Sequence, residues 1–379
     1  MGSVKALAGT VLFKPVQVGP SLLQHRIVMS PMTRFRANDE HVLTDLAVEY
    51  YKQRSSTPGT LIITEATFIA QRAGGLANGA GLWSKEQVAA WKKITDVVHA
   101  NGSFIRAQLY ALGRTALPDV LRAEDPSLPY ISSSATPLTT RSESPRPLTI
   151  EEIKEYVQLY IQAAKNAIEA GFDGVEIHGA NGYLIDQFIK DVVNKRTDDY
   201  GGSIENRARF PLEIIEGVVK AVGEDRTAIR FSPWGTNLEM RIEDPVPQFS
   251  YLLEKIREAY PKFSYVHFVE PDHGRTGSND VFRKIWAPRP FLSASHTAER
   301  PSGWAAESSI NPATTIEAVL KAAEKGDIIA LGRYFLANPD LPLRLKSGIP
   351  LNPPDINTFY AKKISKGYID YPFAEDVKA

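Results

Sequence analysis

Residues 174–184 have the sequence GVEIHGANGYL, in which a short apolar run of β-strand length ends in a polar turn that contains glycine. Similar runs recur along the chain, and their apolar residues do not strictly alternate with polar ones. This pattern is typical of strands buried on both faces of a parallel sheet. The eight runs comprise residues 26–30, 60–69, 104–109, 174–178, 227–231, 265–269, 290–294 and 327–331.

Amphipathic helices are predicted between these runs, and two of them begin with a clear cap. Ser84 followed by Gln87, and Thr149 followed by Glu152, match the capping box, in which each side chain bonds the backbone N–H of the other residue. Further helices are predicted over residues 204–222 and 246–259, and from residue 311 or 314 to residue 325. Eight strand–helix units predict the α/β class and one (β/α)8 TIM barrel.

Three segments between the predicted elements are unusually long. They comprise residues 110–148, 179–202 and 270–289, and each follows the carboxyl end of a predicted strand. In barrels of this kind the loops after the strands carry the chemistry. We therefore expect long insertions at the C-terminal face of the strands and a functional site among them.

The composition excludes several kinds of chemistry. The 379 residues include 44 basic and 44 acidic side chains and no cysteine. Disulfides, thiolate nucleophiles, iron–sulfur clusters and cysteine-bound zinc are thereby excluded. The balanced charge offers no basic surface for nucleic acid, and no apolar run approaches the roughly 18 residues that cross a membrane. We expect a cytoplasmic protein with neither nucleic acid nor membrane as a partner.

Gly332 and Arg333 directly follow the last predicted strand. Loops after the seventh and eighth strands of such barrels often hold phosphate through backbone N–H groups, and arginine can clamp a phosphate with two hydrogen bonds. A surface arginine after a tight turn is an equally good interpretation of the position alone. A second glycine-rich stretch, residues 74–81, does not join a buried strand to a helix, so we interpret it as a loop.

His178, Asn181 and Tyr183 lie within six residues after the fourth predicted strand. The histidine and asparagine offer two hydrogen-bond donors for a carbonyl or phenolate oxygen, and the tyrosine could supply a proton. A metal site is the alternative, but the other histidines are scattered and no His-Glu-x-x-His run occurs. We therefore predict no bound metal.

Seven motifs occur in order and at suitable spacing. They are PMTR at residues 31–34, QL at 108–109, HGANGYL at 178–184, GGSIENR at 201–207, GRYF at 332–335, NPDL at 338–341 and GYIDYP at 367–372. These motifs resemble the Old Yellow Enzyme family, and the sequence as a whole is most similar to its fungal and yeast branch. The resemblance covers residues 12–373, so the whole chain, residues 1–379, is expected to form one domain. It implies an FMN-binding barrel that uses NADPH to reduce the activated C=C bond of an enone or enal.

The resemblance also implies roles at the cofactor. Thr33 would bond flavin O4 and Gln108 the pyrimidine edge, while Arg230 would lie near N1 and O2, where the reduced ring gathers negative charge. Gly332 and Arg333 would hold the FMN phosphate. Pro31, Met32, Ala66 and Ser295 complete the residues expected to contact FMN.

At the substrate, the resemblance implies that His178 and Asn181 hold the carbonyl oxygen. Hydride from reduced FMN would then reach the β-carbon, and Tyr183 would protonate the α-carbon. Tyr110, at a position where the family often has tryptophan, and Tyr371 are expected to line the pocket.

Two alternatives stay open at the level of the sequence. One is a flavin-dependent isomerase or reductase of a fungal alkaloid pathway, and the other is a flavin- and phenol-binding protein without turnover. Isomerases of the family carry phenylalanine where this chain has Tyr183, so the phenol favours net reduction. The lack of cysteine favours the branch without an iron–sulfur cluster. A monomer or homodimer is expected.

Overall fold

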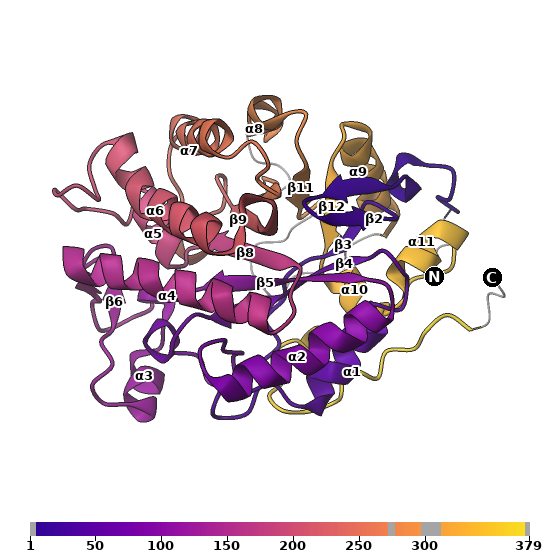
Figure 1. Cartoon of the computed structure of the whole chain (residues 1–379), viewed down its shortest axis with the longest axis horizontal. Coiled ribbons are helices and arrows are strands. Elements are labelled where there is room, and N and C mark those ends of the chain that lie inside the picture. Colours follow the sequence, from indigo (N-terminus) through magenta and orange to yellow (C-terminus); the bar gives the residue numbers. More distant parts are fainter. Residues whose placement is uncertain (1–4, 272–276, 297–311, 376–379) are drawn as a thin grey trace.

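The computed structural model describes residues 5–271, 277–296 and 312–375. Eight parallel strands form a closed barrel, in which each strand pairs with the next along the chain and the last pairs with the first (Figure 1). This confirms the predicted (β/α)8 fold. The barrel strands are β3 (Ile27–Met29), β4 (Leu61–Phe68), β5 (Phe104–Tyr110), β8 (Gly174–Gly179), β9 (Thr227–Phe231), β10 (Tyr265–Val269), β11 (Phe291–Ala294) and β12 (Ile328–Leu331).

Helices surround the barrel, and both predicted capping boxes are present, at Ser84 with Gln87 and at Thr149 with Glu152. The helix predicted from residue 311 or 314 begins at Pro312. The helices are α1 (Asp45–Arg54), α2 (Lys85–Ala100), α3 (Pro118–Glu124), α4 (Ile150–Glu169), α5 (Leu184–Ile189), α6 (Ile204–Val222), α7 (Val246–Ala259), α8 (Asp280–Trp286), α9 (Pro312–Glu324), α10 (Arg333–Ala337) and α11 (Leu341–Ser347).

The apolar core has two main layers. One lies between the strands and the surrounding helices, and the other fills the barrel interior with residues such as Val28, Ile63, Leu292 and Ile328. Strands buried on both faces need apolar residues on both faces, which explains the absence of alternation in their sequences.

An antiparallel hairpin of β1 (Val16–Val18) and β2 (Ser21–Leu23) precedes the barrel. Val18 and Leu23 pack with the residues of the barrel interior, so the hairpin covers one end of the barrel. The sequence analysis did not predict it, since two three-residue strands give too short a pattern. A short pair, β6 (Ile131–Ser132) and β7 (Arg146–Pro147), lies within the insertion after β5.

The C-terminal segment, residues 356–371, is tied to the loop after β3 by two buried arginines. Arg34 donates to the carbonyl oxygens of Phe359 (Nε, 3.1 Å) and Gly367 (Nη2, 2.7 Å). Arg36 donates to the carbonyl oxygen of Thr358 at 3.0 Å. The segment is thereby placed next to the carboxyl end of the first barrel strand.

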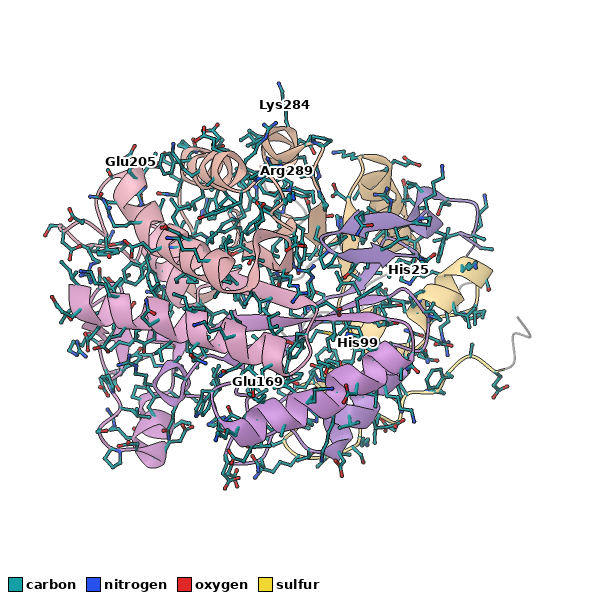
Figure 2. All side chains as sticks on the ribbon, viewed as in Figure 1. His25, His99, Glu169, Glu205, Lys284 and Arg289 are labelled. Atoms are coloured by element: carbon teal, nitrogen blue, oxygen red, sulfur yellow. The ribbon has the colours of Figure 1, made fainter. Side chains whose placement is uncertain are left out.

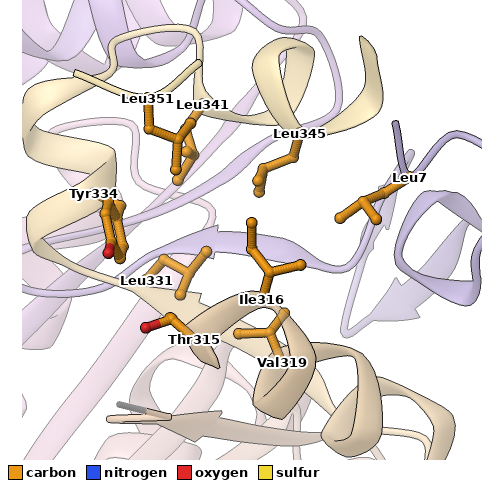
Figure 3. Close-up of a pocket in the computed structure, with 9 residues that line it drawn as sticks. All are labelled: Leu7, Thr315, Ile316, Val319, Leu331, Tyr334, Leu341, Leu345 and Leu351. Atoms are coloured by element: carbon orange, nitrogen blue, oxygen red, sulfur yellow. The ribbon is translucent and has the colours of Figure 1, made fainter. Parts of the chain in front are cut away.

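A small apolar cavity lies between α9, α10 and α11 (Figure 3). Its free volume of about 10 Å³ admits no more than a water-sized molecule. None of the described residues that line it is charged, so it suits neither a phosphate nor a nicotinamide dinucleotide. The lining residues are Leu7, Thr315, Ile316, Val319, Leu331, Tyr334, Leu341, Leu345 and Leu351.

None of the helices in the described residues combines the length and apolar composition that a bilayer crossing demands.

Candidate functional site

The predicted cofactor residues, together with His178, Asn181, Tyr183 and Tyr110, all lie on or directly after the carboxyl ends of barrel strands. Because all eight strands are parallel, these ends meet at one mouth of the barrel. The structure therefore brings to one face side chains that are up to about 300 positions apart in the sequence. They follow or end β3 (Pro31, Met32, Thr33), β4 (Ala66), β5 (Gln108, Tyr110), β8 (His178, Asn181, Tyr183), β9 (Arg230), β11 (Ser295) and β12 (Gly332, Arg333).

Three aromatic rings form the centre of this mouth. The rings of His178 and Tyr183 meet edge to face with centroids 4.9 Å apart, and Tyr110 meets Tyr183 in the same way at 5.1 Å. Tyr110 is itself stacked on Phe68 at 4.9 Å. The Tyr110 hydroxyl is buried and has no hydrogen-bond partner among the described residues, so it is able to bond a polar group of a ligand.

The turn that carries Asn181 and Tyr183 is fixed by buried groups. The Asn181 backbone N–H donates to Ser232 Oγ at 2.7 Å, and the next N–H, of Gly182, donates to Asp186 Oδ2 at 2.9 Å. Asn181 has φ +58°, a left-handed conformation that asparagine tolerates better than most residues. The pairing holds the turn after β8 against the loop after β9.

Burial and neighbouring charge fix the protonation of the two candidate catalytic side chains. Burial, together with the nearby Arg230 guanidinium, holds the pKa of His178 well below its ordinary value. The imidazole is therefore neutral at physiological pH and presents one N–H. Burial raises the pKa of Tyr183 to about 12, so its phenol keeps its proton.

A hydrogen-bonded network fills the barrel interior just beneath the mouth. Gln108 Nε2 donates to Glu176 Oε1 at 2.6 Å, and His267 Nδ1 lies 2.9 Å from Glu176 Oε2. Arg230 lies on β9, between β8 and β10, and is in register with His178 on β8 and His267 on β10. Within the described residues, the side-chain carbonyl oxygen of Gln108 (Oε1) accepts no hydrogen bond, so it can accept one from a ligand.

At the end of β12, Arg333 begins α10 and its guanidinium lies over the ring of Phe359 at 5.4 Å. Gly332 is next to Met32, and a Cβ there would lie 3.4 Å from Met32 Sδ, an ordinary contact. Packing within the protein thus leaves the backbone at residue 332 accessible. Ser295, half-buried with φ +70°, is the last residue but one before the undescribed stretch 297–311. The phosphate roles of these residues stay predictions.

The two C-terminal tyrosines lie in different surroundings. The hydroxyl of Tyr371 accepts a hydrogen bond from the Asp355 N–H at 2.9 Å, so its predicted role in the pocket stays a prediction. Tyr360, which the sequence analysis missed, is partly exposed and its ring lies 5.8 Å from that of Phe35, close enough to the site for its phenol to raise the pKa of Tyr183. Its position depends on the backbone bonds to Arg34 and Arg36, which no local sequence pattern reveals.

Two further residues were missed as functional candidates, Glu176 and His267. Glu176 is two positions before His178 on the same strand, so both side chains face the barrel interior, and this spacing was the available signal. His267 had no comparable local signal.

In the described part of the chain no group of three or more histidine or acidic side chains is arranged to hold a metal. His25 and His99, labelled in Figure 2, lie after β2 and near the end of α2, away from one another in the sequence.

The residues at the mouth fit the flavin that the sequence motifs imply. The free carbonyl oxygen of Gln108 matches an imide N–H, and the Arg230 guanidinium matches a ring that becomes negative on reduction. Pro31, Met32 and Thr33 are only half-buried in the protein, so they can contact a bound ring.

Comparisons with known proteins agree with this geometry. Residues 11–352 match the model of the NADH:flavin oxidoreductase / NADH oxidase family. The chain is 48% identical over 374 residues to chanoclavine-I aldehyde reductase fgaOx3 of Penicillium roqueforti, covering 97% of each chain. It is 43% identical to enoate reductase 1 of Kluyveromyces lactis, covering 99% of this chain and 97% of that one.

A third relative, from Epichloe festucae var. lolii, is named a probable inactive reductase and is 44% identical, covering 96% of each chain. Among solved structures, the Old Yellow Enzyme from Pichia sp. AKU4542 superimposes with a TM-score of 0.88 at 39% identity. That comparison covers 98% of this chain and 95% of the other.

Proposed function

Because the chain belongs to the NADH:flavin oxidoreductase / NADH oxidase family, and within it to the Old Yellow Enzyme family, we propose that it is an FMN-dependent ene-reductase. Its reductant is NADPH, and its substrates are α,β-unsaturated aldehydes and ketones. Among these substrates we favour unsaturated aldehydes, since one of the relatives above is named an aldehyde reductase.

The observation that carries this proposal is the contact between neutral His178 and protonated Tyr183 at the mouth of the barrel. A hydrogen-bond donor that stays neutral can hold a carbonyl oxygen, and a phenol of high pKa next to it keeps a proton ready for the adjacent carbon. Such a pair suits addition of hydrogen across a conjugated C=C bond.

The protein residues divide this work. His178 and Asn181 bind the carbonyl oxygen and draw electron density from the conjugated bond, which makes the β-carbon electron-poor. Tyr183 Oη gives its proton to the α-carbon and regains one from water, since its ring is only half-buried. Gln108, Arg230, Thr33 and Arg333 would hold FMN, which when bound supplies the transfer of reducing equivalents from NADPH to the β-carbon.

Two other functions predict different products. A flavin-dependent isomerase would return a rearranged substrate without consuming NADPH, and a flavin- and phenol-binding protein would show no turnover. Tyr183 disfavours both, because a proton donor beside the carbonyl site has no use in either.

The purified protein tests the proposal directly. It should be yellow, lose its flavin absorbance with NADPH under anaerobic conditions, and regain it when cyclohexenone or an unsaturated aldehyde is added. The product should be the saturated carbonyl compound. A protein that takes up no FMN, or that reoxidises without forming saturated product, contradicts the proposal.

A further inference from the structure

Glu176 lies inside the barrel, two residues before His178 on β8, and is completely buried. Strands β8 and β10 are not neighbours in the sheet, yet Glu176 on β8 contacts His267 on β10 at 2.9 Å. The contact therefore passes through the barrel interior, beneath the mouth at which the candidate site lies.

The bond between Glu176 and Gln108 fixes the orientation of the Gln108 amide. A carboxylate only accepts hydrogen bonds, so the amide must direct its NH2 group at Glu176, as the 2.6 Å contact of Nε2 shows. The amide oxygen then faces away from the carboxylate. A hydrogen-bond acceptor of the protein in this position suits the imide N–H of a flavin and disfavours a ligand that presents an acceptor there.

Glu176 is also the counter-charge of Arg230, since burial lowers the pKa of His267 and leaves its imidazole neutral. Burial alone would raise the pKa of Glu176, but Arg230 and the hydrogen bonds with His267 and Gln108 outweigh burial and hold that pKa below its ordinary value. The carboxylate is therefore ionised at neutral pH. Arg106 and the phenol of Tyr265, near the end of the barrel that the hairpin covers, are close enough to Glu176 for its charge to affect the pKa of each.

We propose that Glu176 is a positioning residue with two effects on the cofactor, an inference that rests on the proposed function. It holds the Gln108 amide in the orientation that binds the flavin, and its negative charge offsets that of Arg230. Through the second effect it keeps the reduction potential of the bound flavin lower than Arg230 alone would set it.

Glu176→Gln tests both effects on the holoenzyme, because it keeps the shape of the side chain and removes the charge. A neutral amide can donate or accept, so Gln108 is no longer held in one orientation, and the dissociation constant for FMN should rise about tenfold. Loss of a buried negative charge favours the more negative reduced flavin, so the midpoint potential should become more positive. A tenfold change in the reduction equilibrium corresponds to about 30 mV for a two-electron couple.

Tyr265→Phe is the matched control, since it changes a side chain that faces the same carboxylate without changing charge or touching Gln108. The control should leave the potential and the FMN affinity at wild-type values. Gln108→Ala separates the two effects. In that background Glu176→Gln should no longer weaken FMN binding, but should still raise the potential.

If Glu176→Gln yields no folded protein, Glu176→Asp decides, because it keeps the charge and shortens the side chain by one methylene. It should weaken FMN binding and leave the potential unchanged, and the reverse result overturns the proposal. If Glu176→Gln has the same FMN affinity and the same midpoint potential as the wild-type holoenzyme, this inference alone is overturned. Wild-type protein that binds no FMN overturns the proposed function as well.

Discussion

Strand β5 places a polar side chain at each end of the barrel interior, and the surroundings of the two side chains differ. At one end Arg106 is covered by the chain itself: its Nη2 donates to the Val18 carbonyl oxygen of the hairpin at 3.4 Å, and its guanidinium lies over the Tyr265 ring at 5.3 Å. At the other end the side-chain oxygen Oε1 of Gln108 accepts no hydrogen bond from the described residues and lies beneath the open mouth.

The difference shows how the fold separates stability from chemistry. The closed end covers a buried cation with backbone and aromatic groups of the protein, even though Nε and Nη1 of Arg106 have no hydrogen-bond partner among the described residues. The open end instead leaves polar groups within reach of a ligand. Changes at the closed end should therefore lower the stability and spare the reaction, whereas changes at the open end should alter the reaction without lowering the stability.

The largest effect is expected at the open end, from Tyr183→Phe. Loss of the proton donor should slow C=C reduction by about 10²- to 10⁴-fold. Reduction of the flavin by NADPH should stay nearly unchanged, because that half-reaction needs no proton from the phenol. Stopped-flow measurement of both half-reactions tests this, and an equal fall in the two rates would show that Tyr183 is not the proton donor.

At the closed end, Gly19→Ala should destabilise the fold by about 2–4 kcal/mol. Gly19 has φ +56°, and a Cβ there would overlap the carbonyl oxygen of Asp225. Denaturant unfolding measures the loss, while kcat at low temperature should equal that of the wild type.

Gly202→Ala is the control for Gly19→Ala, since Gly202 has φ +81° but no atom within 4 Å of an added Cβ. It should cost only the strain of the left-handed backbone, about 1 kcal/mol. Equal losses in the two variants would mean that the hairpin is not packed against the barrel end.

A smaller effect is expected from Tyr110→Phe at the open end. This substitution removes a buried hydroxyl that finds no partner in the described part of the chain, so the ligand-free protein should become more stable by about 1 kcal/mol. For substrates with a second polar group, KM should rise a few-fold, whereas cyclohexenone should be unaffected. A loss of stability in this variant would show that the hydroxyl is already satisfied.

The smallest effect concerns pH. Because the pKa of His178 is held well below its ordinary value and that of Tyr183 is raised to about 12, neither group changes protonation between about pH 6 and pH 10. The rate of C=C reduction by the reduced enzyme should be flat over this range. A decline with an apparent pKa near 9 or 10 would contradict the high pKa of Tyr183.

The sequence predicted the barrel well because eight doubly buried strands leave eight apolar runs, and because caps such as Ser84 with Gln87 mark helix starts locally. It also singled out His178, Asn181 and Tyr183, which lie within six residues at the end of β8 and whose roles stay predictions. The hairpin, Tyr360 and the network of Glu176 with His267 depend on contacts between distant segments. Arg34 and Arg36, for example, hold Tyr360 near the mouth across more than 300 residues.

The most direct test of the central claim follows the origin of the two hydrogens added to the substrate. Reduction of an unsaturated aldehyde in D2O should place deuterium at the α-carbon, since the α-hydrogen comes from Tyr183, which exchanges with solvent. In H2O, with NADPH deuterated at the transferred position of the nicotinamide, any deuterium in the saturated aldehyde should lie at the β-carbon. Deuterium from the nicotinamide at the α-carbon, or an alcohol with its C=C bond intact, would contradict the account.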